Sequence, residues 1–398
     1  MIKRNNITEL LKGVKVEFLP LWKVTTWDKK FNSVDNHKQK HIIKYNYLLA
    51  NELKVLISNN GNVKLLTTNT SDLWTTEKLA GKRVSEGEIV AIPWGGNANV
   101  QYYKGKFLTA DNRIATSNNP DLLSNKYLYY FLLAKKELLN SFYRGSGIKH
   151  PNMAQVLDLL IPIPPISIQT EIVRILDTFT ALTAELTAEL TAELTARKKQ
   201  YNYYLDKLLT FKEDEVEWKT LGEIAENLDY MRKPVTSGLR KSGGIPYYGA
   251  SGIVDYVKDY LFEEDLLLVS EDGANLLARN TPIAFSITGK TWVNNHAHVL
   301  KFKTYGERKF IEYFLNNIDL TPYISGAAQP KLNQKNLSSI KIPILPLTRL
   351  TQIVEILDKF DALTNSITEG LLREIALRQK QYEYYRNLLL DFPKVQES

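Results

Sequence analysis

An internal repeat constrains this chain more than any other feature of its sequence. Residues 162–211 match residues 343–392 at a shift of 181, with 25 identities in 50 positions and no gap. Prolines stand at the start of each copy and end any helix that precedes it, so each copy starts a helix of its own. An ungapped match of this length predicts one structural element built twice.

Both copies predict a long helix with one apolar face. In the first copy, apolar residues recur from Ile172 to Leu194 in steps of three and four, the spacing of a helix with one buried side. From Ser167 to Phe211 such a helix would span about 65 Å, more than a compact domain needs. Equal length and the ungapped match favour pairing of the two copies as an antiparallel coiled coil over separate packing of each helix on its own domain. The predicted seam residues are Leu182, Leu186, Leu190 and Leu194, with Leu363, Ile367, Leu371 and Ile375 at the equivalent positions of the second copy.

Weaker repetition extends into the regions outside the helices. Val16-Glu17-Phe18 resembles Val216-Glu217-Trp218, and an acidic residue leading an apolar strand into a Gly-containing turn occurs in both regions. Short strands, Gly/Asn turns and a few helices predict an α+β fold for each globular region. The predicted division is a first globular domain at 1–161, a first long helix at 162–212 containing three Thr-Ala-Glu-Leu units, a second globular domain at 213–342, and a second long helix and tail at 343–398. The pattern is a pseudo-twofold repeat of globular domain and helix.

Composition narrows the class of protein. The 398 residues include no cysteine, which excludes a disulfide scaffold and a cysteine zinc site, and 44% of them are apolar, as in globular proteins. No apolar run is long enough for a membrane span and no secretory segment opens the chain, so we expect a cytoplasmic protein without membrane contact. Residues 1–165 carry 23 Lys and Arg against 13 Asp and Glu, whereas residues 213–346 carry 15 against 17. The basic first region is a weak indication of a polyanionic partner such as DNA.

The sequence contains no complete catalytic motif. The segment up to Thr291 ends like a phosphate-binding loop, but Ala284 stands where its first glycine belongs, so a hairpin turn is favoured. Glu217-Trp218-Lys219 is better explained as a solvated charge run than as a nuclease motif. His296 and His298 alternate on one face of an expected strand, but no third ligand with metal-site spacing accompanies them. We therefore expect no catalytic and no metal-binding residue in this chain.

The loops of both globular regions are rich in side chains that suit DNA. Lys and Arg neutralise phosphates, while Asn, Gln and Arg can read base edges, although any one of them can equally be an ordinary surface residue. The predicted DNA-binding residues of the first region are Lys29, Lys30, Asn97, Asn99, Gln101, Tyr102, Lys104, Lys106, Arg144 and Lys149. Those of the second region are Arg232, Lys233, Arg240, Lys241, Tyr247, Tyr248, Ser251, Asn275, Arg279, Lys290, Asn294, Asn295, His296 and Lys331.

Over nearly its whole length, the chain resembles a specificity subunit of type I restriction-modification systems. The resemblance rests on Ile161-Pro162-Ile163-Pro164, the Thr-Ala-Glu-Leu repeat, the helix end from Arg197 to Phe211, and Ile245 to Gly252 in the second domain, a motif that the first domain lacks. It implies two target-recognition domains that each read one half of a bipartite DNA target, with the helical pair setting the spacer and docking two methyltransferase subunits. It also implies no catalytic centre here, with S-adenosylmethionine, ATP and magnesium used by modification and restriction/translocase subunits.

Two alternative hypotheses about the function are a protein-binding adaptor and a self-contained enzyme. A coiled-coil adaptor whose two domains bind proteins would have the same helices. A self-contained nuclease or methylase would need active-site motifs that the sequence lacks. The DNA target and the bases read by each residue do not follow from the sequence.

Overall fold

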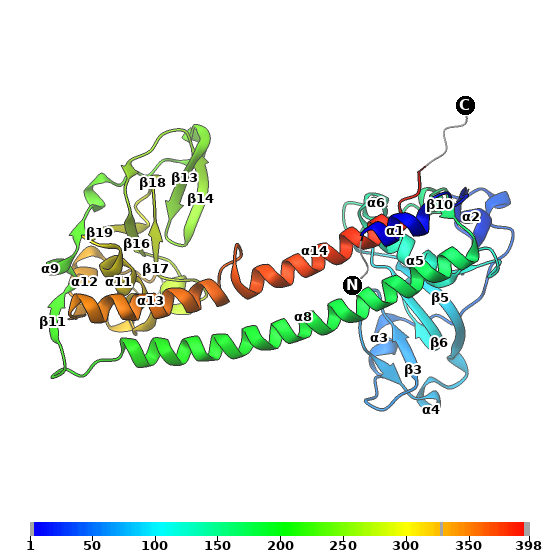
Figure 1. Cartoon of the computed structure of the whole chain (residues 1–398), viewed down its shortest axis with the longest axis horizontal. Coiled ribbons are helices and arrows are strands. Elements are labelled where there is room, and N and C mark those ends of the chain that lie inside the picture. The colour runs from blue at the N-terminus through cyan, green and yellow to red at the C-terminus, as the bar shows by residue number, and fades with distance from the viewer. Residues whose placement is uncertain (1–3, 327–328, 394–398) are drawn as a thin grey trace. The chain divides into compact units, whose positions relative to one another are not determined.

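The computed structural model describes residues 4–326 and 329–393, and the predicted outer limits of the domains at residues 1 and 398 lie outside them. The chain forms two compact units (Figure 1). Unit 1 comprises Met1–Ala188 with Ala376–Ser398, and unit 2 comprises Glu189–Ile375. The long helix α8 (Ile166–Leu209) passes from one unit into the other. Each unit therefore contains a globular part and segments of both repeat copies.

Unit 1 is built on a six-stranded sheet. A central strand of this sheet ends in an apolar run of five buried residues, 89–93, as expected of a strand segment covered on both faces. Helix α5 (Asn125–Ala134) packs against β5, β6 and β7. In sheet order the strands are β2 (Thr25–Trp27), β7 (Asn112–Ser117), β5 (Ser85–Pro93), β6 (Gln101–Thr109), β3 (Val63–Leu66) and β4 (Trp74–Thr75).

Shorter elements complete unit 1. The helices are α1 (Arg4–Leu11), α2 (Leu21–Val24), α3 (Ala50–Lys54), α4 (Glu77–Ala80), α6 (Lys136–Ser141) and α7 (Met153–Leu157). The remaining strands are β1 (Glu17–Pro20), β8 (Tyr143–Arg144), β9 (His150–Pro151) and β10 (Leu160–Ile163). The last of them, β10, leads the chain into the helix α8.

Unit 2 contains two four-stranded sheets. Helix α11 (Tyr305–Asn317) packs against β16 and β17 of the first sheet, and its Thr304–Glu307 capping box fixes where it begins. The first sheet has the order β12 (Glu226–Asn227), β19 (Ala297–Lys301), β16 (Leu266–Ser270) and β17 (Ala284–Ile287). The second has the order β14 (Gly252–Val257), β13 (Ser242–Gly249), β18 (Lys290–Val293) and β15 (Phe262–Glu263). The short helix α9 (Leu221–Ile224) follows β11 (Glu217–Thr220), α10 (Asn275–Ala278) lies between β16 and β17, and α12 (Gln334–Ser338) precedes β20 (Lys341–Ile344).

The weak repeat outside the helices corresponds to a two-stranded ribbon that each unit forms in the same register. In unit 1, β1 pairs with β10 so that Glu17 lies opposite Ile163. In unit 2, β11 pairs with β20 so that Glu217 lies opposite Ile344. The α+β class and the pseudo-twofold repeat are thus confirmed.

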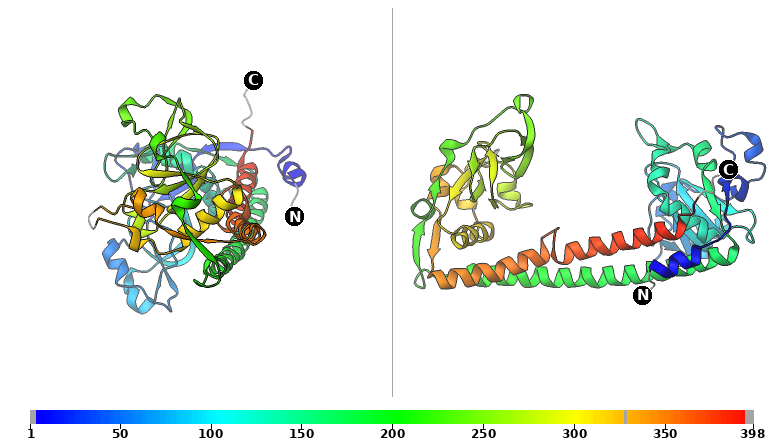
Figure 2. Two further views of the ribbon diagram at one scale, coloured as in Figure 1. Left: turned by 90° about the vertical axis from the view of Figure 1, so that its left-hand side faces the viewer. Right: turned by 45° about the horizontal axis from the view of Figure 1, so that its top comes forward.

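Aromatic contacts show that the two repeat copies run antiparallel. In unit 1 the ring of Phe179 on α8 lies 5.5 Å from that of Tyr385 on α14 (Gly370–Leu390). In unit 2 the ring of Tyr204 on α8 lies 5.3 Å from that of Phe360 on α13 (Leu347–Thr364). Phe179 and Phe360 are equivalent in the repeat, as are Tyr204 and Tyr385, so one contact is made twice with the two copies exchanged. Figure 2 shows α8 beside α14 in unit 1 and beside α13 in unit 2.

The second repeat copy is not the single long helix that the sequence predicts. It is divided into α13 and α14 by the non-helical residues 365–369. The Ser366 hydroxyl accepts hydrogen bonds from the N–H groups of Thr368 and Glu369, and Gly370 has a φ of +71°, a conformation that favours glycine. Apolar spacing continues across this break, which is why the sequence pattern did not reveal it.

The break also changes the predicted seam. Ile367 lies in it with 79% of its surface exposed, and Leu182 on α8 is 55% exposed, so neither is buried as predicted. The other six predicted seam residues are half-buried: Leu186, Leu190, Leu194, Leu363, Leu371 and Ile375.

Within the part of the chain that the structure covers, no helix is long and apolar enough to cross a membrane.

Candidate nucleic-acid interface

Equivalent loops meet at one end of the sheet in each unit. In unit 1, the N–H of Trp94 donates to the carbonyl of Asp111 and that of Gly96 to the carbonyl of Lys149. In unit 2, the N–H of Glu271 donates to the carbonyl of His296 and that of Gly273 to the carbonyl of Pro330. We call residues 94–97, 111 and 144–150 loop cluster 1, and residues 271–274, 294–296 and 329–331 loop cluster 2. The four hydrogen bonds place three separate chain segments together in each cluster.

The buried carboxylate of Asp28 binds the backbone of the strand next to loop cluster 1. Asp28 accepts hydrogen bonds from the N–H of Ile114, at 3.1 Å, and from the hydroxyl of Tyr47, at 2.6 Å. Its carboxylate lies 4.0 Å from the guanidinium of Arg113, whose planar group packs over Trp94. Burial raises the pKa of Asp28 in spite of these partners. The loop that begins at Trp94 is therefore fixed to the interior of the sheet.

Loop cluster 2 has the same support with different side chains. Asp229 accepts a hydrogen bond from the N–H of Val299, at 2.8 Å, and lies 2.6 Å from Nδ1 of the buried His298. Burial alone would raise the pKa of Asp229, but the hydrogen bond from His298, its charge, the Val299 N–H and the charge of Arg232 together lower it. Nε2 of His298 lies 2.7 Å from the carbonyl of Leu332, next to loop cluster 2. His298 thus has a structural role.

In unit 1 the structure brings several of the predicted residues together. A chain of contacts leads from Lys29, whose ammonium lies 5.7 Å from the ring centre of Tyr47, through Asp28 and Arg113 to Trp94. Four further predicted residues are exposed in or next to loop cluster 1: Lys30, Asn97, Arg144 and Lys149. This part of unit 1 combines free cations with an exposed amide, as a surface for DNA requires.

The predicted residues on and before β6 have partners inside the protein. The amides of Asn99 and Gln101 donate to the carbonyls of Thr68 and Thr67, and so fix the loop before β4. Further along, three side chains bond to acids of neighbouring elements: Tyr102 and Lys104 to Glu88, and Lys106 to Glu77. Of this group only Lys104 is mostly exposed, and the others stabilise unit 1 itself.

In unit 2 four of the exposed predicted residues lie in or beside loop cluster 2. The hydroxyl of Ser270 donates to the carbonyl of Ala250, which holds the turn carrying Ser251 beside β16. Asn295, His296 and Lys331 belong to the cluster and are exposed. Asn294 is 7% exposed and its side chain accepts a hydrogen bond from the N–H of His296, so it has a structural role in the cluster.

Other predicted residues of unit 2 are also part of its framework. Arg232 is paired with Glu271 at 2.6 Å and with Asp229 at 3.3 Å, and only 13% of its side chain is exposed. Tyr247 is buried with its hydroxyl accepting from the N–H of Val235, and Arg240 packs over the Tyr247 ring. These structural roles were not predicted, because the sequence does not show the partners that bury the side chains.

Some of the remaining predicted residues of unit 2 have partners inside the protein, and others are exposed. Asn275 bonds the backbone of Thr281 through both amide atoms, and Arg279 donates to carbonyls at the end of α11. Tyr248 is half-buried against Phe285. Three lysines are also exposed. The N–H of Lys233 donates to the carbonyl of Val293, directly before loop cluster 2, whereas Lys241 and Lys290 are not part of the cluster.

Sequence reasoning missed several members of the two clusters. In cluster 1 they include Trp94 and His150, whose Nδ1 lies 2.7 Å from the carbonyl of Trp94. In cluster 2 they include Glu271 and Asp272, because carboxylates were not expected among residues that contact DNA. The signal was present, since the matched turns that follow the two apolar strands contain Trp94, Glu271 and Asp272.

In the described ranges, no group of three or more His, Cys, Asp or Glu side chains could hold a metal ion. The segment before Thr291 is not a hairpin as predicted, because β17 and β18 belong to different sheets and Gly289, with φ +71°, makes the turn between them.

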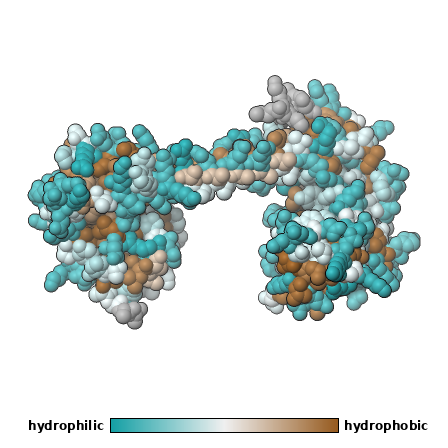
Figure 3. Space-filling model, turned by 90° about the horizontal axis from the view of Figure 1, so that it is seen from below, coloured by the Kyte–Doolittle hydropathy of each residue, from teal (hydrophilic) through white to brown (hydrophobic). Residues whose placement is uncertain are grey.

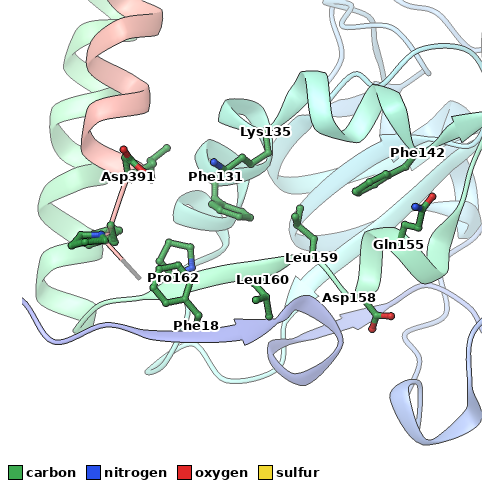
Figure 4. Close-up of a pocket in the computed structure, with 13 residues that line it drawn as sticks. Phe18, Phe131, Lys135, Phe142, Gln155, Asp158, Leu159, Leu160, Pro162 and Asp391 are labelled. Carbon is green, nitrogen blue, oxygen red and sulfur yellow. The ribbon is translucent and has the colours of Figure 1, made fainter. Parts of the chain in front are cut away.

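A cavity of about 740 Å³ opens in unit 1 where α14 ends against β1 and β10 (Figure 4). Most of its lining residues are apolar, Phe18, Phe131 and Pro162 among them, but Lys135 and Asp391 also line it. Asp158, one of its few polar groups, is already paired with Lys38 at 2.6 Å. The cavity thus lies at the junction between helix and unit and shares no lining residue with loop cluster 1. Figure 3 shows apolar patches on an otherwise largely hydrophilic face of the molecule.

Comparison with known proteins bears directly on both units. The family model described as "Type I restriction modification DNA specificity domain" matches residues 35–196 and again residues 213–377. The specificity subunit of the type I restriction enzyme EcoR124I/EcoR124II of Escherichia coli is 35% identical over 99% of this chain and 98% of its own length. The EcoprrI specificity subunit, also of Escherichia coli, is 32% identical over 93% of both chains.

Solved structures agree in fold. The S subunit of a type I restriction-modification system from M. genitalium superposes with a TM-score of 0.52 at 17% identity, covering 96% of this chain and 98% of that one. A chain from a study of complex assembly and conformational transition of the type I system gives a TM-score of 0.55 at 14% identity with the same coverage. With the family model matched in both halves and relatives aligned over almost the full length, this chain belongs to the family of type I restriction-modification DNA specificity subunits.

Proposed function

We propose that each unit reads one half of a bipartite DNA target, unit 1 through loop cluster 1 and unit 2 through loop cluster 2. The observation that carries this proposal is that the two units share the same supporting contacts but differ in the exposed side chains of their loops. The ribbon register, the aromatic contact between the helices and the buried carboxylate recur in both units, while the exposed side chains of the loops differ. A protein that presents two different surfaces on one repeated frame is suited to two different half-sites.

In this proposal the helical repeat has two tasks. Its antiparallel copies hold the two units at a fixed spacing along the duplex, and they dock two methyltransferase subunits. S-adenosylmethionine, ATP and magnesium would be used by the modification and restriction/translocase subunits, and this chain would supply recognition without catalysis. Family membership sets aside the adaptor hypothesis, since the family is one of DNA specificity subunits.

The test is an exchange of residues 213–342 for the corresponding segment of a relative with a known target. The chimera, assembled with its methyltransferase subunits, should methylate sites in which only one half has changed, as measured by sequencing methylated genomic DNA. Binding of the complex to its target should weaken steeply with salt, because phosphate contacts release counterions. A chimera in which both half-sites change would overturn the assignment of one unit to each half.

A further inference from the structure

The two loop clusters differ in charge at equivalent positions. Gly95 in unit 1 corresponds to Asp272 in unit 2, because the residues on both sides of each make the same pair of backbone hydrogen bonds. Unit 2 therefore has a carboxylate where unit 1 has no side chain. The exposed residues nearby in unit 1 include the cations Arg144 and Lys149.

Asp272 is held in one orientation at the surface. Its carboxylate oxygens lie 2.8 and 3.0 Å from Nδ1 of His296. Its backbone forms an isolated bridge with Lys331, and the neighbouring Glu271 is tied by its N–H to the carbonyl of His296. The side chain of Asp272 remains 35% exposed and that of His296 52% exposed. The carboxylate thus keeps lone pairs directed to solvent on a rigid backbone.

The second carboxylate of the cluster has a different environment. Glu271 is only 12% exposed and lies 2.6 Å from Arg232 and 3.1 Å from the ammonium of Lys331. Its charge is neutralised inside the protein, whereas that of Asp272 reaches the surface. A carboxylate at a DNA surface is repelled by phosphates, so it is favourable there only where a base offers a hydrogen-bond donor. In the major groove the donors are the exocyclic amino groups of cytosine and adenine.

We propose that Asp272 is a specificity-determining residue, positioned by His296, that accepts a hydrogen bond from the exocyclic amino group of a cytosine or an adenine in the half-site read by unit 2. This inference rests on the proposed function and adds to it the chemical class of the base. Unit 1, with glycine at this position, makes no such contact.

The test uses the complex with its methyltransferase subunits and duplexes in which one base of the mapped target is replaced. Purine in place of adenine, or pyrimidin-2-one in place of cytosine, removes the amino group alone. For one position of the unit 2 half-site, the wild-type complex should lose about tenfold or more in affinity with the amino-free base. Which analogue has this effect identifies the base.

The variants decide whether Asp272 is the acceptor. Asp272→Asn should bind the normal and the amino-free duplex nearly equally and should relax methylation at that position only. His296→Ala should weaken discrimination at the same position, and His296→Gln should restore part of it. Asp259→Asn, which changes an exposed carboxylate outside the cluster, is the matched control and should behave as wild type.

Three outcomes are distinct. If Asp272→Asn keeps the full discrimination of the wild type, the carboxylate is only an ion-pair partner of His296 and the inference is wrong while the proposed function stands. If the wild-type complex has no bipartite target, the proposed function itself fails. If Asp272→Asn melts at a lower temperature than wild type, Asp272→Glu, which retains the acceptor, must still discriminate at that position for the inference to hold.

Discussion

The ring of Phe360 stacks on that of Tyr204 at an interplanar angle of 28°, and the equivalent residues Phe179 and Tyr385 meet at 47° in the other unit. Both pairs join α8 to the second repeat copy, and each lies within one compact unit. The repeat therefore encodes two local connections between helix and helix. Each unit has its own connection, and each should be removable separately.

We expect Phe179→Ala to destabilise unit 1 and Phe360→Ala to destabilise unit 2. Both rings are half-buried, so the loss should be about 1–3 kcal/mol, less than for a fully buried phenylalanine. Urea unfolding followed by limited proteolysis identifies which unit opens first. Tyr203→Phe, at a position 58% exposed, is the control and should leave the unfolding free energy unchanged. Equal opening of both units in either variant would contradict the independence of the two contacts.

A second repeated connection joins each globular part to the helices. The hydroxyl of Tyr130 donates to Asp177 at 2.6 Å, and that of Tyr313 donates to Asp358 at 2.6 Å. Burial, reinforced by the neighbouring carboxylate, raises the pKa of both tyrosines above the usual 10.0.

This shift makes stability depend on alkaline pH. Because the folded state holds these protons more tightly than the unfolded state, the contribution is complete below about pH 10 and declines as the pH rises further. Tyr130→Phe and Tyr313→Phe should each reduce stability at neutral pH by about 1–3 kcal/mol and should reduce the decline above pH 10. Thermal melting at several pH values measures both effects. A variant whose decline matches that of wild type would show that its hydroxyl is not the titrating group.

The break in the second repeat copy depends on Gly370. A Cβ atom at this position would lie 2.4 Å from the carbonyl oxygen of Ala362, and its φ of +71° disfavours any L side chain. Gly370→Ala should therefore lower the free energy of unfolding by more than about 1 kcal/mol, measured by urea unfolding. Gly244→Ala, where the new atom meets nothing within 4 Å, should have a much smaller effect.

Deletion of Thr187–Leu190, one Thr-Ala-Glu-Leu unit, should shorten the unread spacer and leave both half-sites intact. The deletion removes four residues from the continuous helix α8, shortening it by about 6 Å and changing its phase by about 40°. One base pair advances about 3.4 Å and about 34° along the duplex, so the phase change favours a spacer one base pair shorter. Methylome sequencing of the deletion strain measures the spacer. If the spacer stays the same length, α8 does not set the distance between the half-sites.

The sequence predicted the helices and the equivalent positions of the repeat better than it predicted which side chains are exposed. The repeat located both helical copies, and Glu17 and Glu217 correctly marked equivalent positions, because local periodicity and self-similarity are visible along a chain. The break near Ser366 was missed, since Leu363 and Leu371 continue the apolar spacing across it. The framework roles of Arg232 and Tyr247 could not be predicted, because their partners come from distant segments.

The buried carboxylates Asp28 and Asp229 have a consequence for how such proteins can change. Each one supports its loop cluster by bonding the backbone of a neighbouring strand, at Ile114 or Val299, and makes no use of the exposed side chains of the loops. Mutations of the exposed loop side chains therefore leave the support intact. New recognition can then arise one residue at a time, by drift within a loop, as well as by exchange of whole domains between relatives.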